Sequence, residues 1–175
     1  MNRNLLLLGL MVVLFVIYPL FFKKKNKHSK KRESAEKVLK KLQTFEHPAQ
    51  KLAYLKKIDP FTFEELILTA LQRKGIVIKR NDRYTGDGGI DGRFQHDGSM
   101  WLIQAKRYND RVRLEHLKAF SALLVENQCN GIFVHTATTP KSVREASNRI
   151  PGCQLEIISG DRLLALFNSN IKNTF

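Results

Sequence analysis

Helical and strand patterns alternate in the second half of the chain, and their order limits the folds that it can adopt. The spacing of apolar and capping residues predicts helices at 114–128, 139–148 and 161–167. Short apolar runs predict strands at 131–135 and 155–158. Strands that alternate with helices usually pair in parallel. This half therefore predicts a parallel sheet that is covered by helices.

Two of these helices are assigned a start from capping chemistry. Thr139 followed by Pro140 is typical of a cap and a first helical turn. Asp161 is expected to cap the last helix through its side chain.

The preceding stretch has a different order, one helix followed by three strands. Residues 61–74 have a helical period that ends at Gly75, and strands are predicted at 76–78, 90–94 and 101–107. Turn-rich segments separate these strands, and the last two are expected to form a hairpin. Together the two halves predict an α/β fold, a mixed β-sheet flanked by helices.

An apolar run without any charged residue occupies residues 5–22. As a helix it would span roughly 27 Å, close to the thickness of a bilayer's hydrocarbon core. A basic block at 23–32 follows, and such blocks stay on the cytoplasmic side. A cleaved signal peptide is the alternative, but the run is long and no small-residue cleavage site follows. We therefore expect a single transmembrane helix at 1–25 in the inner (cytoplasmic) membrane, with the rest in the cytoplasm.

A Lys-rich connector is predicted at 26–49, before a globular domain at 50–175. It has a weak helical face formed by Val38, Leu39, Leu42 and Phe45. A helix on the membrane, a helix packed on the domain and a simple spacer all remain open.

The chain is strongly basic, with a formal net charge of +14. Residues 1–49 hold 11 Lys/Arg and 3 Asp/Glu, a net +8, and residues 50–175 hold 19 and 13, a net +6. A basic domain favours polyanion partners, because binding releases counterions from phosphates. The same charge also serves solubility, so that charge alone does not decide between the two.

The two cysteines, Cys129 and Cys153, are not part of a C-x-x-C pair, and no histidine stands beside them at zinc-ligand spacing. They are interpreted as ordinary thiols of a reducing compartment, not as a disulfide or a zinc site.

Polar residues on one strand carry the candidate chemistry. In an extended strand Gln104 and Lys106 point to one face, while Ile103 and Ala105 point to the other. If the hairpin forms, Asp91 can meet the two polar side chains. Each residue alone has a simpler interpretation, a solvent-facing strand residue or a turn residue. Both polar residues on one face of an apolar strand weaken that alternative.

Such a cluster suits the hydrolysis of a phosphodiester. A carboxylate can hold a hard divalent cation, which lowers the pKa of a bound water. A lysine beside it can orient that water or neutralise developing charge. A third oxygen ligand could come from Glu64 or Glu65 on the first predicted helix.

Several motifs together resemble a known family. They are Phe63-Glu64-Glu65, Gly86-Asp87-Gly88-Gly89-Ile90-Asp91, Gln104-Ala105-Lys106-Arg107-Tyr108, Gly131-Ile132-Phe133-Val134 and Ser159-Gly160-Asp161-Arg162-Leu163. From about Asp59 to Phe167 the chain resembles the Mrr-like branch (type IV restriction endonucleases) of the restriction-endonuclease-like superfamily. Its signature is D…(E/Q)-x-K. The resemblance implies the restriction-endonuclease-like fold and Mg²⁺-dependent cleavage of DNA, with Mn²⁺ as a substitute.

The resemblance also implies a role for each matching residue. Asp91, Gln104, Glu64 and the backbone carbonyl of Ala105 are expected to hold the metal, and Lys106 to lie near the attacking water. Gln104 stands where most of the superfamily has Glu, which removes one negative charge. Glu64 fits the family position better than Glu65, because it directly follows Phe63. Asp87 is either a contributor or a turn residue.

Contacts with DNA are expected from Arg107, Arg111 and Arg113, which follow the catalytic strand and precede a helix. Mrr proteins carry a separate N-terminal DNA-binding module, and this chain has the expected anchor in its place. Recognition of modified bases is therefore not predicted.

The sequence thus predicts a membrane-anchored DNA endonuclease that acts on incoming foreign DNA. The expected partners are DNA, the membrane and a second copy of the chain, since such nucleases often pair to cut both strands. A nuclease-fold module that binds DNA at the membrane without cutting it is the alternative. A membrane-tethered scaffold is a third class.

Overall fold

The computed structural model describes residues 27–81 and 89–168 of the chain. Its contacts divide the chain after Lys30, and the sheet belongs to the unit that begins at Lys31. The strands are β1 (Lys79–Arg80), β2 (Gly92–His96), β3 (Ser99–Lys106), β4 (Asn130–His135) and β5 (Leu155–Ile158). The helices are α2 (Lys27–Gln43), α3 (Pro48–Leu55), α4 (Pro60–Arg73), α5 (Leu114–Glu126), α6 (Lys141–Ser147) and α7 (Gly160–Leu166).

The five strands form one mixed sheet in the order β1-β2-β3-β4-β5. The pairs β1–β2 and β2–β3 are antiparallel, whereas β3–β4 and β4–β5 are parallel. Asp97 and Gly98, with φ of 48° and 73°, form the turn between β2 and β3. Two positive φ angles fit a type I′ turn, which matches the twist of a hairpin. The predicted hairpin and the parallel strands that follow it are confirmed.

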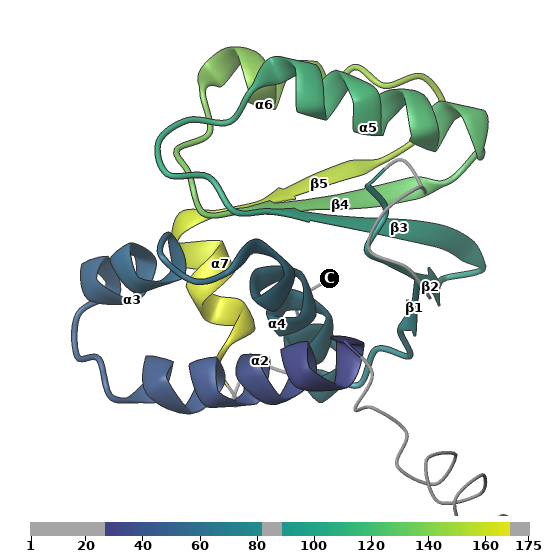
Figure 1. Ribbon diagram of the computed structural model, residues 1–175. Helices are drawn as coiled ribbons and strands as arrows, with labels where there is room; N and C mark the ends of the chain where they lie inside the picture. Colours follow the sequence, from purple (N-terminus) through teal and green to yellow (C-terminus); the bar gives the residue numbers. More distant parts are fainter. Residues whose placement is uncertain (1–26, 82–88, 169–175) are drawn as a thin grey trace, which may run out of the picture. The chain divides into compact units, whose positions relative to one another are not determined.

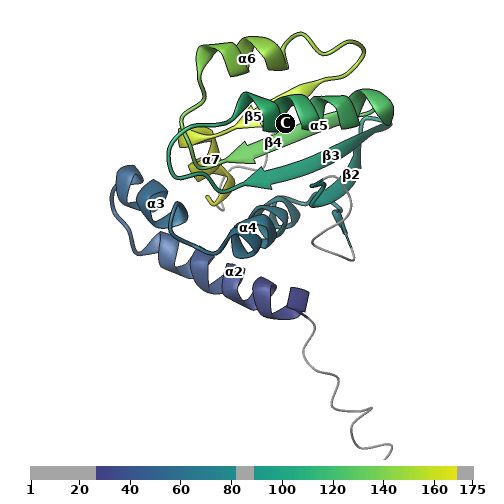
Figure 2. The same cartoon turned by 45° about the horizontal axis from the view of Figure 1, so that its top comes forward.

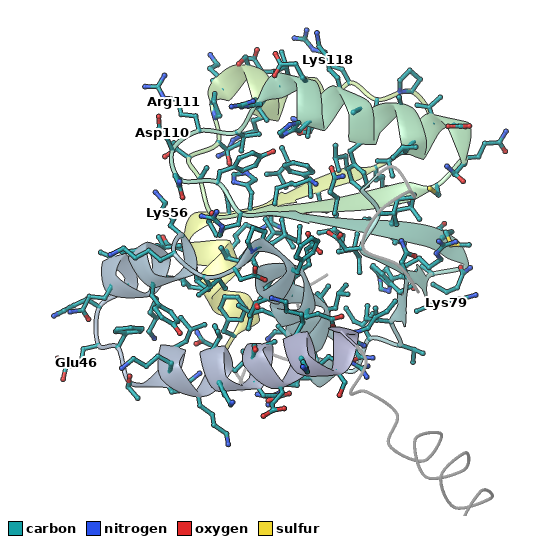
Figure 3. All side chains as sticks on the ribbon, viewed as in Figure 1. Glu46, Lys56, Lys79, Asp110, Arg111 and Lys118 are labelled. Carbon is teal, nitrogen blue, oxygen red and sulfur yellow. The ribbon has the colours of Figure 1, made fainter. Side chains whose placement is uncertain are left out.

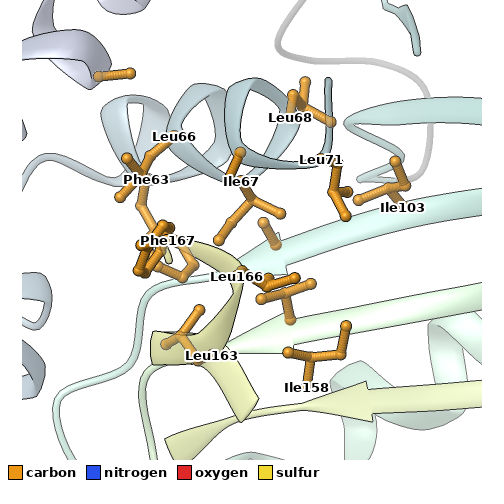
Figure 4. Close-up of a cluster of buried hydrophobic side chains, with 14 of the residues drawn as sticks. Phe63, Leu66, Ile67, Leu68, Leu71, Ile103, Ile158, Leu163, Leu166 and Phe167 are labelled. Atoms are coloured by element: carbon orange, nitrogen blue, oxygen red, sulfur yellow. The ribbon is translucent and has the colours of Figure 1, made fainter. Parts of the chain in front are cut away.

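Helices cover both faces of this sheet (Figures 1 and 2). Helices α5 and α6 lie on one face, and α4 and α7 lie on the other. Strand β3 supplies both cores because its side chains alternate. Ile103, labelled in Figure 4, and Ala105 pack on the α4 side, whereas Leu102 packs with Phe120 and Phe133 on the α5 side.

Helix α2 extends the domain beyond its predicted boundary at residue 50. Ala35, Val38, Leu39 and Leu42 are buried in the same core as α4. Their spacing of i, i+3, i+4 and i+7 forms one helical stripe. Of the three alternatives for this segment, the structure shows the helix packed on the domain. The compact unit that contains the sheet therefore starts at Lys31 and takes in most of the predicted connector.

The strand predicted at 76–78 is wrong. Ile78 is buried and Ile76 packs against the core, but Val77 is 88% exposed and no strand forms there. Only Lys79 and Arg80 reach β2, opposite Arg93 and Gly92. The β-branched run anchors the chain to the core before the sheet begins.

Both predicted caps are also corrected. The N-cap positions of α6 and α7 are Pro140 and Ser159, and neither cap makes a side-chain hydrogen bond. Thr139 instead uses its hydroxyl to bind His135 and Ser159. Asp161 lies within the first turn of α7, where its negative charge interacts favourably with the helix dipole.

Two predicted features lie outside the described residues, the membrane anchor at 1–25 and the turn that contains Asp87. In the ranges 27–81 and 89–168, no helix combines the length and the apolar character needed to cross a bilayer.

Candidate active site

Asp91 is held directly beside β3. Its backbone N–H donates to the Ile103 carbonyl at 2.8 Å, and its Oδ2 accepts from the Ala105 N–H at 2.6 Å. The carboxylate therefore takes the place of a backbone acceptor where β2 has not yet begun. Since Ala105 stands between Gln104 and Lys106, this bond brings the carboxylate to the strand positions predicted from the sequence.

Gln104 and Lys106 converge on Gly89, two residues before Asp91. The Gln104 Nε2 donates to the Gly89 carbonyl at 2.9 Å. A Cβ built on Gly89 would lie 2.5 Å from Gln104 Nε2 and 3.6 Å from Lys106 Nζ. Gly89 also has φ +84°, which favours glycine. The structure thus places the amide and the ammonium on the same side of β3, next to the segment that carries Asp91.

One atom of this cluster lacks a partner. Gln104 is 4% exposed, and its Oε1 is buried without a hydrogen bond among the residues that the structure describes. An unsatisfied buried acceptor costs about 1–3 kcal/mol, so such atoms commonly mark a bound water or ion. A carbonyl oxygen next to a carboxylate suits a hard cation such as Mg²⁺.

The Ala105 carbonyl is the remaining oxygen that the sequence predicts as a ligand. A strand residue directs its N–H and its C=O to the same neighbour, and the Ala105 N–H meets Asp91. Within the described ranges no three His, Cys, Asp or Glu side chains form a metal-binding group. The oxygens of Gln104 and of the Ala105 backbone stay predicted metal ligands beside the Asp91 carboxylate.

Asn81, the residue after β1, fixes the same segment and was not among the predicted site residues. Its side-chain amide donates to the Ile90 carbonyl, and its N–H donates to the Asp91 carbonyl at 3.4 Å. The Arg93 guanidinium in turn donates to Asn81 Oδ1 at 3.1 Å. An Asn at the end of a short strand was the only available signal.

The two glutamates of α4 have different surroundings. Glu65 is 1% exposed and forms ion pairs with Arg80 at 2.9 Å and Arg32 at 3.9 Å. Glu64 is half-buried, one turn before Leu68. A Leu68 methyl lies 2.9 Å from where a Cβ of Gly92 would be, so this stripe of α4 faces the start of β2. Glu64 therefore stays the predicted third ligand, whereas Glu65 has a structural partner.

The family comparison agrees with this geometry. The Mrr_cat model, described as a restriction endonuclease, matches residues 55–167, more than half of the chain. The chain belongs to this restriction endonuclease family. The match contains α4, all five strands and the group formed by Asp91, Gln104 and Lys106, called the Asp91 cluster below. No curated protein and no solved structure matches the chain.

The arginines that follow β3 in this Mrr_cat domain differ in their contacts. Arg107 donates to the Lys56 carbonyl and, at 2.8 Å, to Asn109 Oδ1, so it joins the loop to the end of α3. Arg111 and Arg113 are exposed. Figure 3 shows Arg111 pointing outward at the loop before α5. All three remain predicted DNA contacts, but Arg107 already has partners within the protein.

His135 lies next to Lys106, on the neighbouring strand β4. His135 pairs with Lys106 in the register of β3 and β4 and is fully buried. Its Nδ1 accepts from the Ala137 N–H at 3.2 Å, so Nε2 carries the proton and donates to Thr139 Oγ1, 3.1 Å away. Burial lowers the pKa of His135 to about 4. This imidazole is therefore neutral at ordinary pH and adds no charge beside Lys106.

Tyr108 packs within the protein. Its ring stacks on His116 with centroids 5.6 Å apart, and its hydroxyl is hydrogen-bonded to His116 Nδ1. Thr136 Oγ1 accepts from the Tyr108 N–H at 2.9 Å and donates to its carbonyl at 2.6 Å. Burial raises the pKa of Tyr108 to about 12, so the phenol stays protonated. Both contacts hold the chain two residues after Lys106.

Proposed function

We propose that this protein is a divalent-metal-dependent DNA endonuclease, anchored in the inner (cytoplasmic) membrane, that cuts incoming foreign DNA. One observation carries the nuclease part. The Asp91 carboxylate is bound to the Ala105 N–H between Gln104 and Lys106, beside the buried, unpartnered Gln104 Oε1. Mg²⁺ is the proposed metal, and Mn²⁺ can replace it.

Each group of the cluster has a separate task. Asp91, Gln104 and the Ala105 carbonyl would supply oxygens for the metal, and Glu64 is proposed as a further ligand. Once bound, the metal lowers the pKa of a water and stabilises charge on the phosphate. The ammonium of Lys106 orients that water and offsets the charge that develops in the transition state.

The test is plasmid cleavage by the full-length chain in detergent, with Mg²⁺ or Mn²⁺. We expect nicking by the wild type and none by Asp91→Asn, which keeps an acceptor for the Ala105 N–H but loses the charge. Asp97→Asn is the matched control, because Asp97 is exposed in a turn with positive φ that Asn tolerates. Equal cleavage by Asp91→Asn would refute the assignment.

A DNA-binding module without activity is the second candidate. Gln104 favours it, because the amide contributes no negative charge to hold a cation. Binding of plasmid by the wild type without nicking, and binding unaltered by Lys106→Ala, would support this alternative. Affinity that does not fall as salt rises would instead point to a scaffold without a nucleic-acid role.

The membrane part of the proposal is supported by the uncharged run at 5–22 and the basic block after it. Removal of residues 1–26 leaves all of α2 in place. We expect this shortened chain to cleave DNA in solution but to lose restriction of incoming DNA in cells. Unchanged restriction by the shortened chain would reject the role of the anchor.

We further propose that Arg111 and Arg113 bind phosphates of the DNA. Both are exposed beside the start of α5, and Arg111 can be followed in Figure 3. Charge reversal at either position is expected to weaken binding of all sequences alike and to reduce its dependence on salt. A second copy of the chain is the proposed partner for cutting both strands.

A further inference from the structure

The two cysteines lie side by side at the ends of two neighbouring strands. Cys129 immediately precedes β4, and Cys153 lies two residues before β5. The parallel register pairs Gly131 with Leu155, and extending it by two residues places Cys129 opposite Cys153. The Gly131 N–H donates to the carbonyl of Gln154, the residue after Cys153, at 2.8 Å.

Both thiols are directed to the same face of the sheet. Cys129 belongs to the core beneath α5, and Cys153 packs against that core. Both residues also reach the Leu124 carbonyl, the Cys129 N–H at 3.0 Å and the Cys153 Sγ at 3.5 Å. Neighbouring strands lie about 4.8 Å apart, within the Cα separation of roughly 4.4–6.8 Å that a disulfide bridges.

We propose that Cys129 and Cys153 are a redox pair, which forms a reversible intramolecular disulfide between the starts of β4 and β5 when the protein meets a peroxide. The sequence predicted ordinary thiols, because spacing along the chain could not show that strand pairing brings them together. This site is independent of the proposed nuclease activity.

The exposure of the two thiols sets the order of the reaction. Cys153 is partly exposed, whereas Cys129 is buried and its pKa is raised by that burial. The Cys153 thiolate attacks one peroxide oxygen, the O–O bond breaks, and a sulfenic acid and water form. The Cys129 sulfur then attacks the Cys153 sulfur, the S–O bond breaks, and a second water leaves. Two thiols lose two hydrogens, and one peroxide becomes two waters.

The bond would form at the opposite end of the strands from Lys106. Strand β4 runs parallel to β3, and Lys106 pairs with His135, the last residue of β4. Six residues of strand separate the two ends, about 20 Å. We therefore expect the disulfide to raise stability by restricting the unfolded chain, without altering the Asp91 cluster.

The full-length chain in detergent tests the pair. It is treated with hydrogen peroxide, denatured, alkylated and weighed before and after dithiothreitol. We expect a monomer lighter by two hydrogen atoms that resists alkylation, regains both thiols on reduction, and melts several degrees higher when oxidised. Cys153→Ser and Cys129→Ala should show no such shift of melting temperature.

Three results would overturn the proposal. These are two thiols that remain open to alkylation after peroxide, cross-linked dimers in place of the lighter monomer, and Cys153 oxidised to a sulfinic acid while Cys129 stays reduced. Cys153→Ser changes a partly exposed side chain, so the control does not depend on the buried variant folding.

Discussion

The carboxylates of Glu65 and Asp91 lie on either side of the start of β2, but their surroundings differ. Glu65 meets the Arg80 Nε at 2.9 Å, and Arg80 uses its other nitrogens for Gln72 Oε1 at 2.7 Å and Thr69 Oγ1 at 3.3 Å. Arg80 therefore binds all three of these polar groups. Arg80 in turn pairs with Gly92, the residue after Asp91.

The Asp91 cluster is not closed in this way. Gln104 uses its Nε2 for the Gly89 carbonyl, while its buried Oε1 has no partner among the described residues. The Lys106 ammonium approaches the same glycine. A closed set of polar atoms stabilises the fold, whereas a buried atom with an unused lone pair fits a ligand. The contrast favours a structural role for Glu65 and supports the role that we propose for Asp91.

The largest effect is expected from Lys106→Met. Methionine keeps most of the side-chain volume but removes the charge, so cleavage should fall by up to about 1000-fold, as for other transition-state contacts. Thermal unfolding should change little. Lys79→Met at an exposed position is the control (Figure 3), and it should cleave normally. A similar rate for both variants would remove Lys106 from the site.

The ion pair of Glu65 and Arg80 should affect stability and not cleavage. Glu65→Ala leaves Arg80 with an uncompensated charge near the core, and loss of one partner of a buried pair costs about 3–5 kcal/mol. Urea unfolding can be followed by the fluorescence of Trp101, the single tryptophan, which is buried. Cleavage per folded molecule should be unchanged.

Glu64→Ala is the matched variant one residue earlier. We expect it to lower cleavage and to leave the free energy of unfolding nearly unchanged. If Glu64→Ala destabilised the protein as much as Glu65→Ala, the distinction between the two glutamates would be lost.

Periodicity explains which parts of this picture could be predicted. Alternation along a strand is a local property, so the common face of Gln104 and Lys106 followed from their spacing alone. The hairpin of the strands predicted at 90–94 and 101–107 also followed, and the structure closes it with Asp97 and Gly98, whose positive φ angles suit such a turn. The parallel strands followed from the alternation of elements.

Contacts between distant elements could not be predicted in the same way. The bond from Ala105 to Asp91 depends on where β2 begins, and the clamp by Asn81 depends on β1, a strand that was placed too early. The resemblance favoured Glu64 over Glu65, but the ion pair of Glu65 could not be predicted, because Arg80 becomes its partner only in the folded chain. His135 appeared as an ordinary residue of a buried strand.

His135 is expected to make the free energy of unfolding depend on pH. Its pKa of about 4 lies below the ordinary value of 6.5, so the unfolded chain takes up a proton first as pH falls. The stability that the neutral imidazole contributes is therefore present above pH 6.5 and is lost as pH falls towards 4, by about 3 kcal/mol.

His135→Gln should flatten this dependence of the free energy of unfolding on pH, measured in urea from pH 7 to pH 4. The exposed His96 supplies the control, and His96→Gln should keep the wild-type slope. An unchanged slope in His135→Gln would mean that other groups cause the loss of stability in acid.

The smallest effect is expected from Gln104→Glu, which tests whether Gln104 binds the metal. Gln104→Glu adds a negative charge beside Asp91, so the Mg²⁺ concentration for half-maximal cleavage should fall by about tenfold, equivalent to about 1.4 kcal/mol. The same change removes the N–H that donates to the Gly89 carbonyl, so the metal-free variant should unfold more easily than the wild type. Added Mg²⁺ should then raise its melting temperature more than it raises that of the wild type. A variant that is destabilised and does not respond to Mg²⁺ would show that Gln104 closes the cluster with Gly89 and holds no metal.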